Sequence, residues 1–375
     1  MLQLFSVDDH IVEPPHVWTD RVAAKFRETA PHVIEEDGRQ YWVYEDRRHT
    51  NMGLNAVAGK PREQWGNDPI RFSDMIPGCY DPKARAEDMR ADGIFASVNF
   101  PTLPRFGGAL FLSFNDKELA DVCVRAWNDF VLDEWCAAAP EMFVPMIICQ
   151  LWDPALASKE IERCVSKGAR AVCFIEDPLP FGLPSFHTAH WDPFWGACED
   201  AGVPVCMHLS SSGSTFLGDQ DPPVVEIASA FVKSARASIN LMVSPVPHKF
   251  PRIKMVWSEG GIGWIPAALE RADRQYARHK YWSTLPEGMP SEVAAKNMWW
   301  CMIEEPVGLK YRYDIGVDRI MWECDYPHAD STWPDSQKIA SEVLDGVPSD
   351  EVEMITHKTA CSLFDWMAPA RQSRA

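Results

Sequence analysis

Residues 6–15 read Ser-Val-Asp-Asp-His-Ile-Val-Glu-Pro-Pro, and they overlap the end of an apolar run, residues 2–7, that predicts a β-strand. Alternate residues of an extended chain point to the same side, so Asp8 and His10 project together. A carboxylate oxygen and an imidazole nitrogen aimed at one point form half of a divalent metal site. Glu13 offers a third ligand. The same residues also fit a solvated acidic turn, so the metal interpretation depends on the rest of the chain.

From residue 91 onward, short apolar strands alternate with helical segments. This pattern is typical of parallel strands that are covered by helices on both sides. The predicted strands are residues 2–7, 93–101, 143–150, 169–175, 203–209, 252–257, 298–303 and 319–324. Eight strands close a (β/α)8 TIM barrel. We therefore predict an α/β fold with residues 1–375 in a single barrel domain. An open doubly wound sheet is the alternative, although no glycine-rich fingerprint follows the first strand.

Residues 30–85 depart from this rhythm. Residues 39–48 alternate in the manner of a β-hairpin, and residues 49–82 are rich in Gly, Pro, Asn and Asp. Long irregular segments in compact enzymes commonly form lids or substrate loops. We predict a lid-like loop and hairpin insertion over the carboxyl-terminal mouth of the barrel, with plain surface decoration as the alternative.

Polar side chains follow four of the predicted strands. Beyond the first-strand group, His208 follows residues 203–207, Glu259 follows residues 252–257, and Asp325 with His328 follows residues 319–324. The carboxyl ends of barrel strands converge on one mouth, so these groups are expected to meet there. A lone histidine after an apolar strand is usually structural. Its recurrence with carboxylates at four strand ends favours a metal site.

The composition excludes some partners. The chain has 375 residues and a formal net charge of −18, which disfavours nucleic acid and anionic membranes. No apolar run is long enough to span a membrane, and the N-terminus lacks the pattern of a signal peptide. The eleven cysteines form no CxxC pair, and we interpret them as reduced core thiols in a cytoplasmic protein.

The sequence resembles the amidohydrolase superfamily, specifically the branch of metal-dependent hydrolases related to aminocarboxymuconate-semialdehyde decarboxylase. The resemblance covers essentially the whole chain. Its most specific motif is Asp325-Tyr326-Pro327-His328 followed by residues 330–334. The other matching segments are residues 7–10 with Glu13, 77–82, 202–208 and 259–264. The resemblance implies a (β/α)8 barrel with a divalent metal at its mouth.

The resemblance also assigns ligands by position. Asp8 and His10 match the first-strand ligand pair, His208 the fifth-strand ligand and Asp325 the eighth-strand carboxylate. The chain departs from the family where its decarboxylases place a proton-handling histidine after the sixth strand, because Glu259 stands there. That departure weighs against decarboxylation, since the acid would be a carboxylic acid with a raised pKa.

From these residues we expect a metal-dependent hydrolase that activates water for attack on a small apolar or aromatic carbonyl or carboxylate substrate. Asp325 would take the proton of the water, Glu259 would act as acid, base or ligand, and His328 would orient a carboxylate or the substrate. Zinc is the expected ion, with iron or manganese as alternatives. We also expect the chain to form a homo-oligomer, specifically a dimer.

Two other activities stay open. Two histidines (His10, His208) and four carboxylates (Asp8, Glu13, Glu259, Asp325) are a ratio typical of di-iron sites, which predicts a monooxygenase as the alternative. A non-oxidative decarboxylase is the less favoured third possibility. Ser210, Ser211 and Ser212 fit either a loop that grips a substrate carboxylate or a simple polar turn.

Overall fold

The parallel strands form two sheets in the computed structural model, which describes residues 1–213 and 220–369. One sheet has the order β1 (Leu4–Ile11), β5 (Ile94–Pro101), β6 (Phe143–Val144). The second sheet has the order β12, β11, β10, β9, β8, β7, so spatial order follows chain order. Its bounds are β7 (Met146–Ile147), β8 (Ala171–Phe174), β9 (Val205–His208), β10 (Met255–Ser258), β11 (Met298–Met302) and β12 (Ile320–Trp322). The predicted α/β fold with parallel strands is confirmed.

The two sheets approach each other at both of their edges. Only Pro145 separates β6 from β7, and its carbonyl accepts the N–H groups of Arg170 and Ala171. At the other edge, the N–H of Asp325 donates to the carbonyl of Asp8 at 2.8 Å, and the N–H of His10 donates to the carbonyl of Tyr326 at 2.7 Å. These bonds attach the chain that follows β12 to β1.

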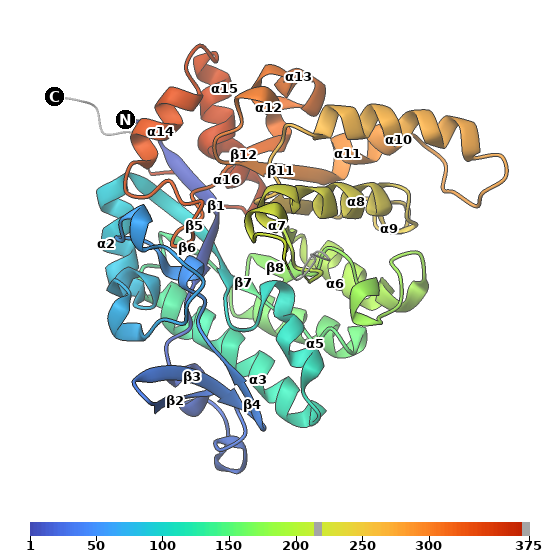
Figure 1. The fold of residues 1–375 in the computed structure, drawn as a ribbon. Helices are drawn as coiled ribbons and strands as arrows, with labels where there is room; N and C mark the ends of the chain where they lie inside the picture. Colours follow the sequence, from blue (N-terminus) through green and yellow to red (C-terminus); the bar gives the residue numbers. More distant parts are fainter. Residues whose placement is uncertain (214–219, 370–375) are drawn as a thin grey trace.

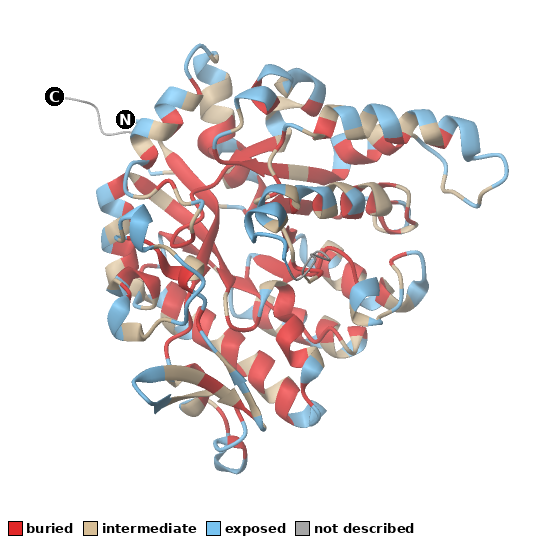
Figure 2. Cartoon of the chain, viewed as in Figure 1, coloured by how far each residue is buried: buried red, intermediate tan, exposed pale blue. Residues whose placement is uncertain are grey.

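The strands are buried because their sequences are almost continuously apolar, as expected for strands covered on both faces. Figure 2 shows them as the buried interior of the molecule, with exposed residues on the outer sides of the helices. The first strand is the exception, because all eight of its residues are buried although three are Asp8, Asp9 and His10. It extends to Ile11, beyond the predicted end at residue 7, so Asp8 and His10 lie within the strand.

Helices connect the strands, and their ends follow local sequence signals. Asp81, Asp116 and Asp153 accept hydrogen bonds from backbone N–H groups in the first turns of α2 (Pro82–Asp92), α3 (Lys117–Phe130) and α5 (Pro154–Ser166). Gly202, at φ 69°, ends α6 (Asp192–Ala201) in the left-handed conformation. The longer later helices are α8 (Phe231–Met242), α10 (Ile265–His279), α11 (Pro290–Asn297) and α14 (Ser336–Val343). The shorter helices are α1 (His16–Thr19), α4 (Cys136–Ala138), α7 (Val224–Ser229), α9 (Val246–Lys249), α12 (Pro306–Lys310), α13 (Arg312–Ile315), α15 (Ser349–Glu353) and α16 (Thr359–Leu363).

The segment 30–85 contains the predicted hairpin and a further strand. β2 (His32–Glu36), β3 (Arg39–Tyr44) and β4 (Arg47–His49) form an antiparallel sheet, drawn in dark blue apart from the parallel strands in Figure 1. The N–H groups of Val57 and Ala58 donate to the carbonyl of Pro327 at 3.0 and 3.3 Å, and Val12 N–H donates to the carbonyl of Cys79 at 3.0 Å. The later part of the segment therefore contacts the chain just beyond β12 and β1.

Among the described residues, no helix combines the length and the apolar character that crossing a membrane requires.

Candidate metal centre

Asp8 and His10 lie next to each other on β1, as the two-residue period predicts. Both side chains are completely buried, and His10 Nε2 is 3.3 Å from Asp8 Oδ1. The parallel neighbour β5 holds this part of the strand, with Asn99 beside Asp9 and Phe100 beside His10. The strand thus places one oxygen and one nitrogen donor at the same point.

His208, the last residue of β9, brings a second imidazole to this point. Its Nε2 atom lies 3.2 Å from His10 Nε2 and 3.4 Å from Asp8 Oδ2. Its Nδ1 atom is 2.6 Å from the carbonyl oxygen of Leu209, an acceptor that requires Nδ1 to carry the proton. When the ring is neutral, its lone pair is therefore on Nε2, which faces His10 and Asp8. A backbone carbonyl that fixes the tautomer in this way is common behind metal-binding histidines.

Asp325 and His328 complete the cluster from the loop after β12. Asp325 Oδ1 is 3.1 Å from His10 Nε2 and 3.2 Å from His328 Nδ1. The ring of His328 stacks on that of His10 with centroids 3.6 Å apart. Asp325 has φ 60°, an uncommon conformation for a residue other than glycine, and such strain often accompanies functional sites.

The cluster has the properties of a cation site. Donor atoms of Asp8, His10 and His208 lie within 4.8 Å of one another, and so do those of His10, Asp325 and His328. Both carboxylate oxygens of Asp8 and of Asp325 are buried without a hydrogen-bond partner among the described residues. Burial and neighbouring carboxylates raise the pKa of Asp8 and Asp325 well above the usual value, and burial lowers the pKa of His10. A divalent cation would offset the cost of burying these carboxylates and would give their oxygens a partner, so the donors fit a metal ion.

Glu259, after β10, borders this cluster. Its Oε2 atom is 3.0 Å from His208 Nε2, and its backbone is left-handed at φ 59°. Burial acts to raise the pKa of Glu259, but the positive charge and hydrogen bond of a protonated His208, together with the charge of His328, outweigh that effect and the pKa falls below its usual value. The side chain is thus an anion beside His208. The structure places Glu259 beside His208 and outside both three-residue donor groups.

Glu13 lies elsewhere. Its carboxylate accepts hydrogen bonds from the N–H groups of Thr102 and Leu103 at 3.0 and 2.7 Å and from the Trp127 indole at 3.0 Å. It belongs to neither three-residue donor group. The chain has left the strand after Ile11, so the side chain turns toward the loop after β5. In this structure Glu13 holds that loop.

Two buried ionisable residues that the sequence analysis did not single out, Glu323 and Arg85, support the centre. Glu323 accepts the N–H of Glu259 with both carboxylate oxygens, at 3.1 and 3.2 Å, and so holds the left-handed turn. The Arg85 guanidinium donates to the carbonyls of His10 at 2.6 Å and Gly78 at 2.8 Å, and it lies 4.0 Å from the Tyr326 ring centroid. Glu323 lies two residues before Asp325, so the two-residue period of a strand could have identified Glu323 from the sequence. Nothing local in the sequence marks Arg85.

The serine-rich loop after His208 is engaged within the protein. Ser212 Oγ donates to Glu176 Oε1 at 2.9 Å, and Ser211 Oγ accepts the N–H of Glu176 at 2.9 Å. Ser234 of α8 donates to the other oxygen of Glu176, also at 2.9 Å. The buried carboxylate therefore fixes this loop against α8. The Ser212 hydroxyl already donates to Glu176, and Ser211 Oγ is held as an acceptor by the Glu176 N–H, which favours the polar turn over the carboxylate grip.

The comparisons with known proteins give the family. The amidohydrolase family model matches residues 16–366, and the chain belongs to that family. The protein is therefore an enzyme of the amidohydrolase superfamily, as the resemblance predicted. A gamma-resorcylate decarboxylase from Rhizobium sp. (strain MTP-10005) is 28% identical over 250 residues, which cover 60% of this chain and 73% of the relative.

Solved structures agree with the α/β fold. An amidohydrolase from Mycobacterium avium subsp. paratuberculosis K-10 superimposes with a TM-score of 0.74 at 21% identity, covering 97% of this chain and 99% of the other. A dihydroxybenzoic acid decarboxylase from Polaromonas sp. JS666, with bound manganese and the inhibitor 2-nitroresorcinol, gives a TM-score of 0.64 at 17% identity and 97% coverage of both chains.

These relatives correct the predicted function. The curated relatives are gamma-resorcylate decarboxylases, so the expectation of a hydrolase is wrong and the di-iron oxygenase has no support among them. The hydrolase expectation followed the commonest chemistry of the superfamily, although the same carboxylates and imidazoles serve more than one reaction. The sequence analysis also gave too much weight to Glu259, which stands where the family's decarboxylases have a histidine, as an argument against decarboxylation. A divalent metal is supported, whereas zinc in particular is not.

Proposed function

We propose that this protein is a metal-dependent, non-oxidative decarboxylase of a hydroxylated aromatic carboxylate. The observation that carries the proposal is the buried group of unpaired carboxylate oxygens and imidazole nitrogens within a chain whose curated relatives are gamma-resorcylate decarboxylases. A small-molecule substrate with an apolar ring fits the aromatic wall of the site, where Phe106 stacks on His208 with centroids 3.7 Å apart.

Asp8, His10, His208 and Asp325 would hold the ion in this proposal. Mixed carboxylate and imidazole donors suit Mn²⁺, the ion bound in the solved decarboxylases from Polaromonas and Novosphingobium aromaticivorans. A divalent ion would supply Lewis-acid polarisation of substrate oxygens. Glu259 would stay beside His208 and adjust its position and charge.

The reaction replaces a carboxylate on the ring with a proton. The bond between the ring carbon and the carboxylate breaks, its electron pair stays on the ring, carbon dioxide leaves, and a proton forms the new C–H bond. We assign the proton delivery to the Asp325 and His328 pair, because their side chains are in contact at 3.2 Å on the same loop. Glu259 is engaged with His208 and lies outside this pair.

We also propose that the two parallel sheets form one closed (β/α)8 barrel with residues 1–375 as a single catalytic domain. The hydrogen bonds from Asp325 to Asp8 and from His10 to Tyr326 support closure at one edge, and Pro145 supports continuity at the other. His208 then lies on the fifth strand and Asp325 after the eighth. Residues 57 and 58 contact the chain just beyond β12, and residue 79 contacts the chain just beyond β1, which supports a place for the 30–85 insertion beside the mouth.

A second copy of the chain would form a dimer through α7 and the start of α8. Helix α7 has no buried residue, and Figure 2 colours it as exposed or intermediate. The exposed apolar side chains are Val224, Val225, Ile227, Phe231 and Val232. Such a row on a soluble protein usually marks an interface. In a chain of net charge −18, a row with few charges is also where two copies repel each other least.

The test of the function is a decarboxylation assay on manganese-loaded protein with 2,6-dihydroxybenzoate, 5-carboxyvanillate and related hydroxybenzoates. We expect release of carbon dioxide and incorporation of one deuterium on the ring in D₂O. Absence of turnover across the whole panel, with metal bound, would contradict the proposal.

Light scattering tests the dimer. The wild type should have twice the monomer mass, and the double variant Ile227→Glu/Val232→Glu should have the monomer mass. A monomeric wild type would refute the dimer.

A further inference from the structure

A cavity of about 320 Å³ lies at the opposite ends of the strands from the metal centre. Its wall is built from the turns that precede β8, β9 and β10, closed by the end of α16. The lining residues that carry the argument are Arg170, Val203, Lys254, Phe364 and Asp365. Its volume lies within the range of small-molecule sites.

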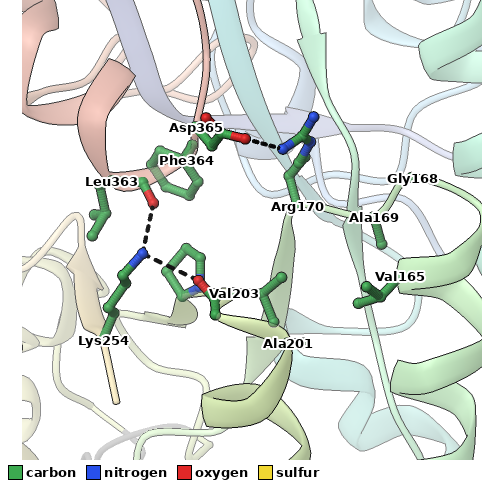
Figure 3. A pocket seen from close by; sticks show the side chains of 12 residues that line it. Val165, Gly168, Ala169, Arg170, Ala201, Val203, Lys254, Leu363, Phe364 and Asp365 are labelled. Carbon is green, nitrogen blue, oxygen red and sulfur yellow. Dashed lines mark hydrogen bonds and ion pairs between the residues drawn. The ribbon is translucent and has the colours of Figure 1, made fainter. Parts of the chain in front are cut away.

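The cavity contains two cations and one carboxylate. Figure 3 shows Lys254 and Arg170 on either side of the segment that carries Phe364 and Asp365. Arg170 Nη1 is 2.5 Å from Asp365 Oδ2, and the side chain of Asp365 is 89% exposed. The positive charge in this cavity is therefore only half balanced, within a chain whose net charge is −18.

The ammonium group of Lys254 has two carbonyl acceptors and no carboxylate partner among the described residues. This group donates to the carbonyls of Gly202 at 3.1 Å and Leu363 at 3.5 Å, and no carboxylate of the described residues lies within 4.0 Å of it. Burial lowers the pKa of Lys254, which shows that its charge is partly desolvated. Arg170 also has unused donors, because a guanidinium carries five N–H groups and one of them serves Asp365. An anion would satisfy both side chains.

The rest of the lining is apolar. Five apolar residues, Val165, Val203, Pro204, Leu363 and Phe364, also line this cavity. An inorganic anion would leave this surface without a partner. A molecule with a carboxylate at one end and an apolar body at the other would use both parts of the wall.

We propose that this cavity is a binding site for a small carboxylate with an apolar or aromatic body, separate from the metal centre. The carboxylate would lie between Lys254 and Arg170, displacing Asp365 toward solvent, and the body would pack on Val203 and Phe364. The proposal does not depend on the reaction catalysed at the other end of the barrel.

The test is titration of metal-loaded protein with 4-fluorobenzoate, followed by ¹⁹F NMR and calorimetry. We expect two classes of site. Lys254→Met and Arg170→Met should each weaken one class by about 10-fold or more, because a charge-assisted hydrogen bond is lost. His208→Ala should remove only the other class. Lys254→Arg should restore binding in part, and inorganic phosphate should compete weakly.

Lys249→Met is the matched control, because Lys249 is an exposed lysine paired with Asp192 on the neighbouring surface. It should bind like wild type. Thermal unfolding of every variant distinguishes lost binding from lost folding, and Arg170, which is partly exposed, provides a variant with little risk to the core. A single class of site that only His208→Ala removes, or unchanged binding in both folded cation variants, would overturn the proposal.

Discussion

The Nε2 atoms of His10 and His208 lie 3.2 Å apart, although the two residues are 198 positions apart in the chain. Each imidazole comes from the carboxyl end of a buried strand, and the Leu209 carbonyl orients the ring of His208 from behind. Burial disfavours the charged form of His10 and lowers its pKa. Two imidazole nitrogens that face each other beside the carboxylates of Asp8 and Asp325 form an arrangement that is ready for a cation.

Replacement of His208 should remove the metal. His208→Ala deletes one of the two facing nitrogens, so we expect the metal content to fall from about one ion per chain toward zero while the protein stays folded. Plasma mass spectrometry of protein purified with manganese measures the ion, and circular dichroism measures the fold. His187→Ala is the control, because His187 is exposed and contacts Asn240. Full metal retention in folded His208→Ala would exclude it as a ligand.

Glu259→Gln should separate metal binding from catalysis. Glutamine keeps the shape and the contact with His208 but loses the negative charge. If Glu259 acts from beside the ligands, we expect one ion per chain and a fall in kcat of about 10- to 100-fold. Glu304→Gln, at an exposed carboxylate nearby, should behave as wild type. Loss of the metal in Glu259→Gln would instead make Glu259 a ligand, and wild-type kcat would leave it no catalytic role.

Arg85 should prove important for stability. Arg85→Met leaves the buried carbonyls of His10 and Gly78 without their donor, and we expect the free energy of unfolding to fall by about 2–6 kcal/mol, from about 1–3 kcal/mol for each carbonyl. Arg85→Lys should recover only part of the loss, because an ammonium group lacks the planar fork. Urea denaturation measures both variants. Arg90→Met, on the exposed side of α2, loses one surface contact with Glu141 and should change stability by less than about 1 kcal/mol. Equal effects at the two positions would contradict this view.

The sequence was sufficient where the structure depends on short-range pattern. Alternation placed Asp8 and His10 on one side of a strand, and the recurrence of strands and helices indicated parallel sheets. The position of Glu13 depended on where the first strand ends. That end is set by pairing with β5, which extends the strand to Ile11 and directs Glu13 to the backbone of Thr102 and Leu103.

The contacts that the sequence did not predict are long-range. Arg85 joins α2 to the carbonyl of His10, 75 positions away, and Glu323 reaches Glu259 across 64 positions. No local periodicity encodes such pairs, since they arise from the packing of elements that are distant in the chain. The prediction of the reaction type was wrong for a different reason. The same ligands support hydrolysis and decarboxylation, so the residues that bind the metal do not by themselves identify the bond that breaks.

Glu13 should make stability depend on pH. Burial raises its pKa to about 7, above the ordinary value of 4.5, so the folded protein holds a proton that the unfolded chain releases. The stabilisation from that proton is complete below about pH 4.5 and is lost as the pH rises to about 7. Glu13→Gln does not titrate and keeps one acceptor oxygen. Its stability relative to wild type should therefore increase by up to about 3 kcal/mol between about pH 5 and pH 8.

Urea denaturation of both metal-loaded proteins across this pH range gives the comparison, and the difference between them cancels the titration of other groups such as Asp9. Glu118→Gln, at an exposed carboxylate paired with Lys25, is the control and should follow the wild-type curve. Burial is what distinguishes the two positions, since Glu13 is 1% exposed and the side chain of Glu118 is 68% exposed. A constant difference between Glu13→Gln and wild type at every pH would show that Glu13 is already ionised in the folded protein. Its three hydrogen bonds would then outweigh the effect of burial.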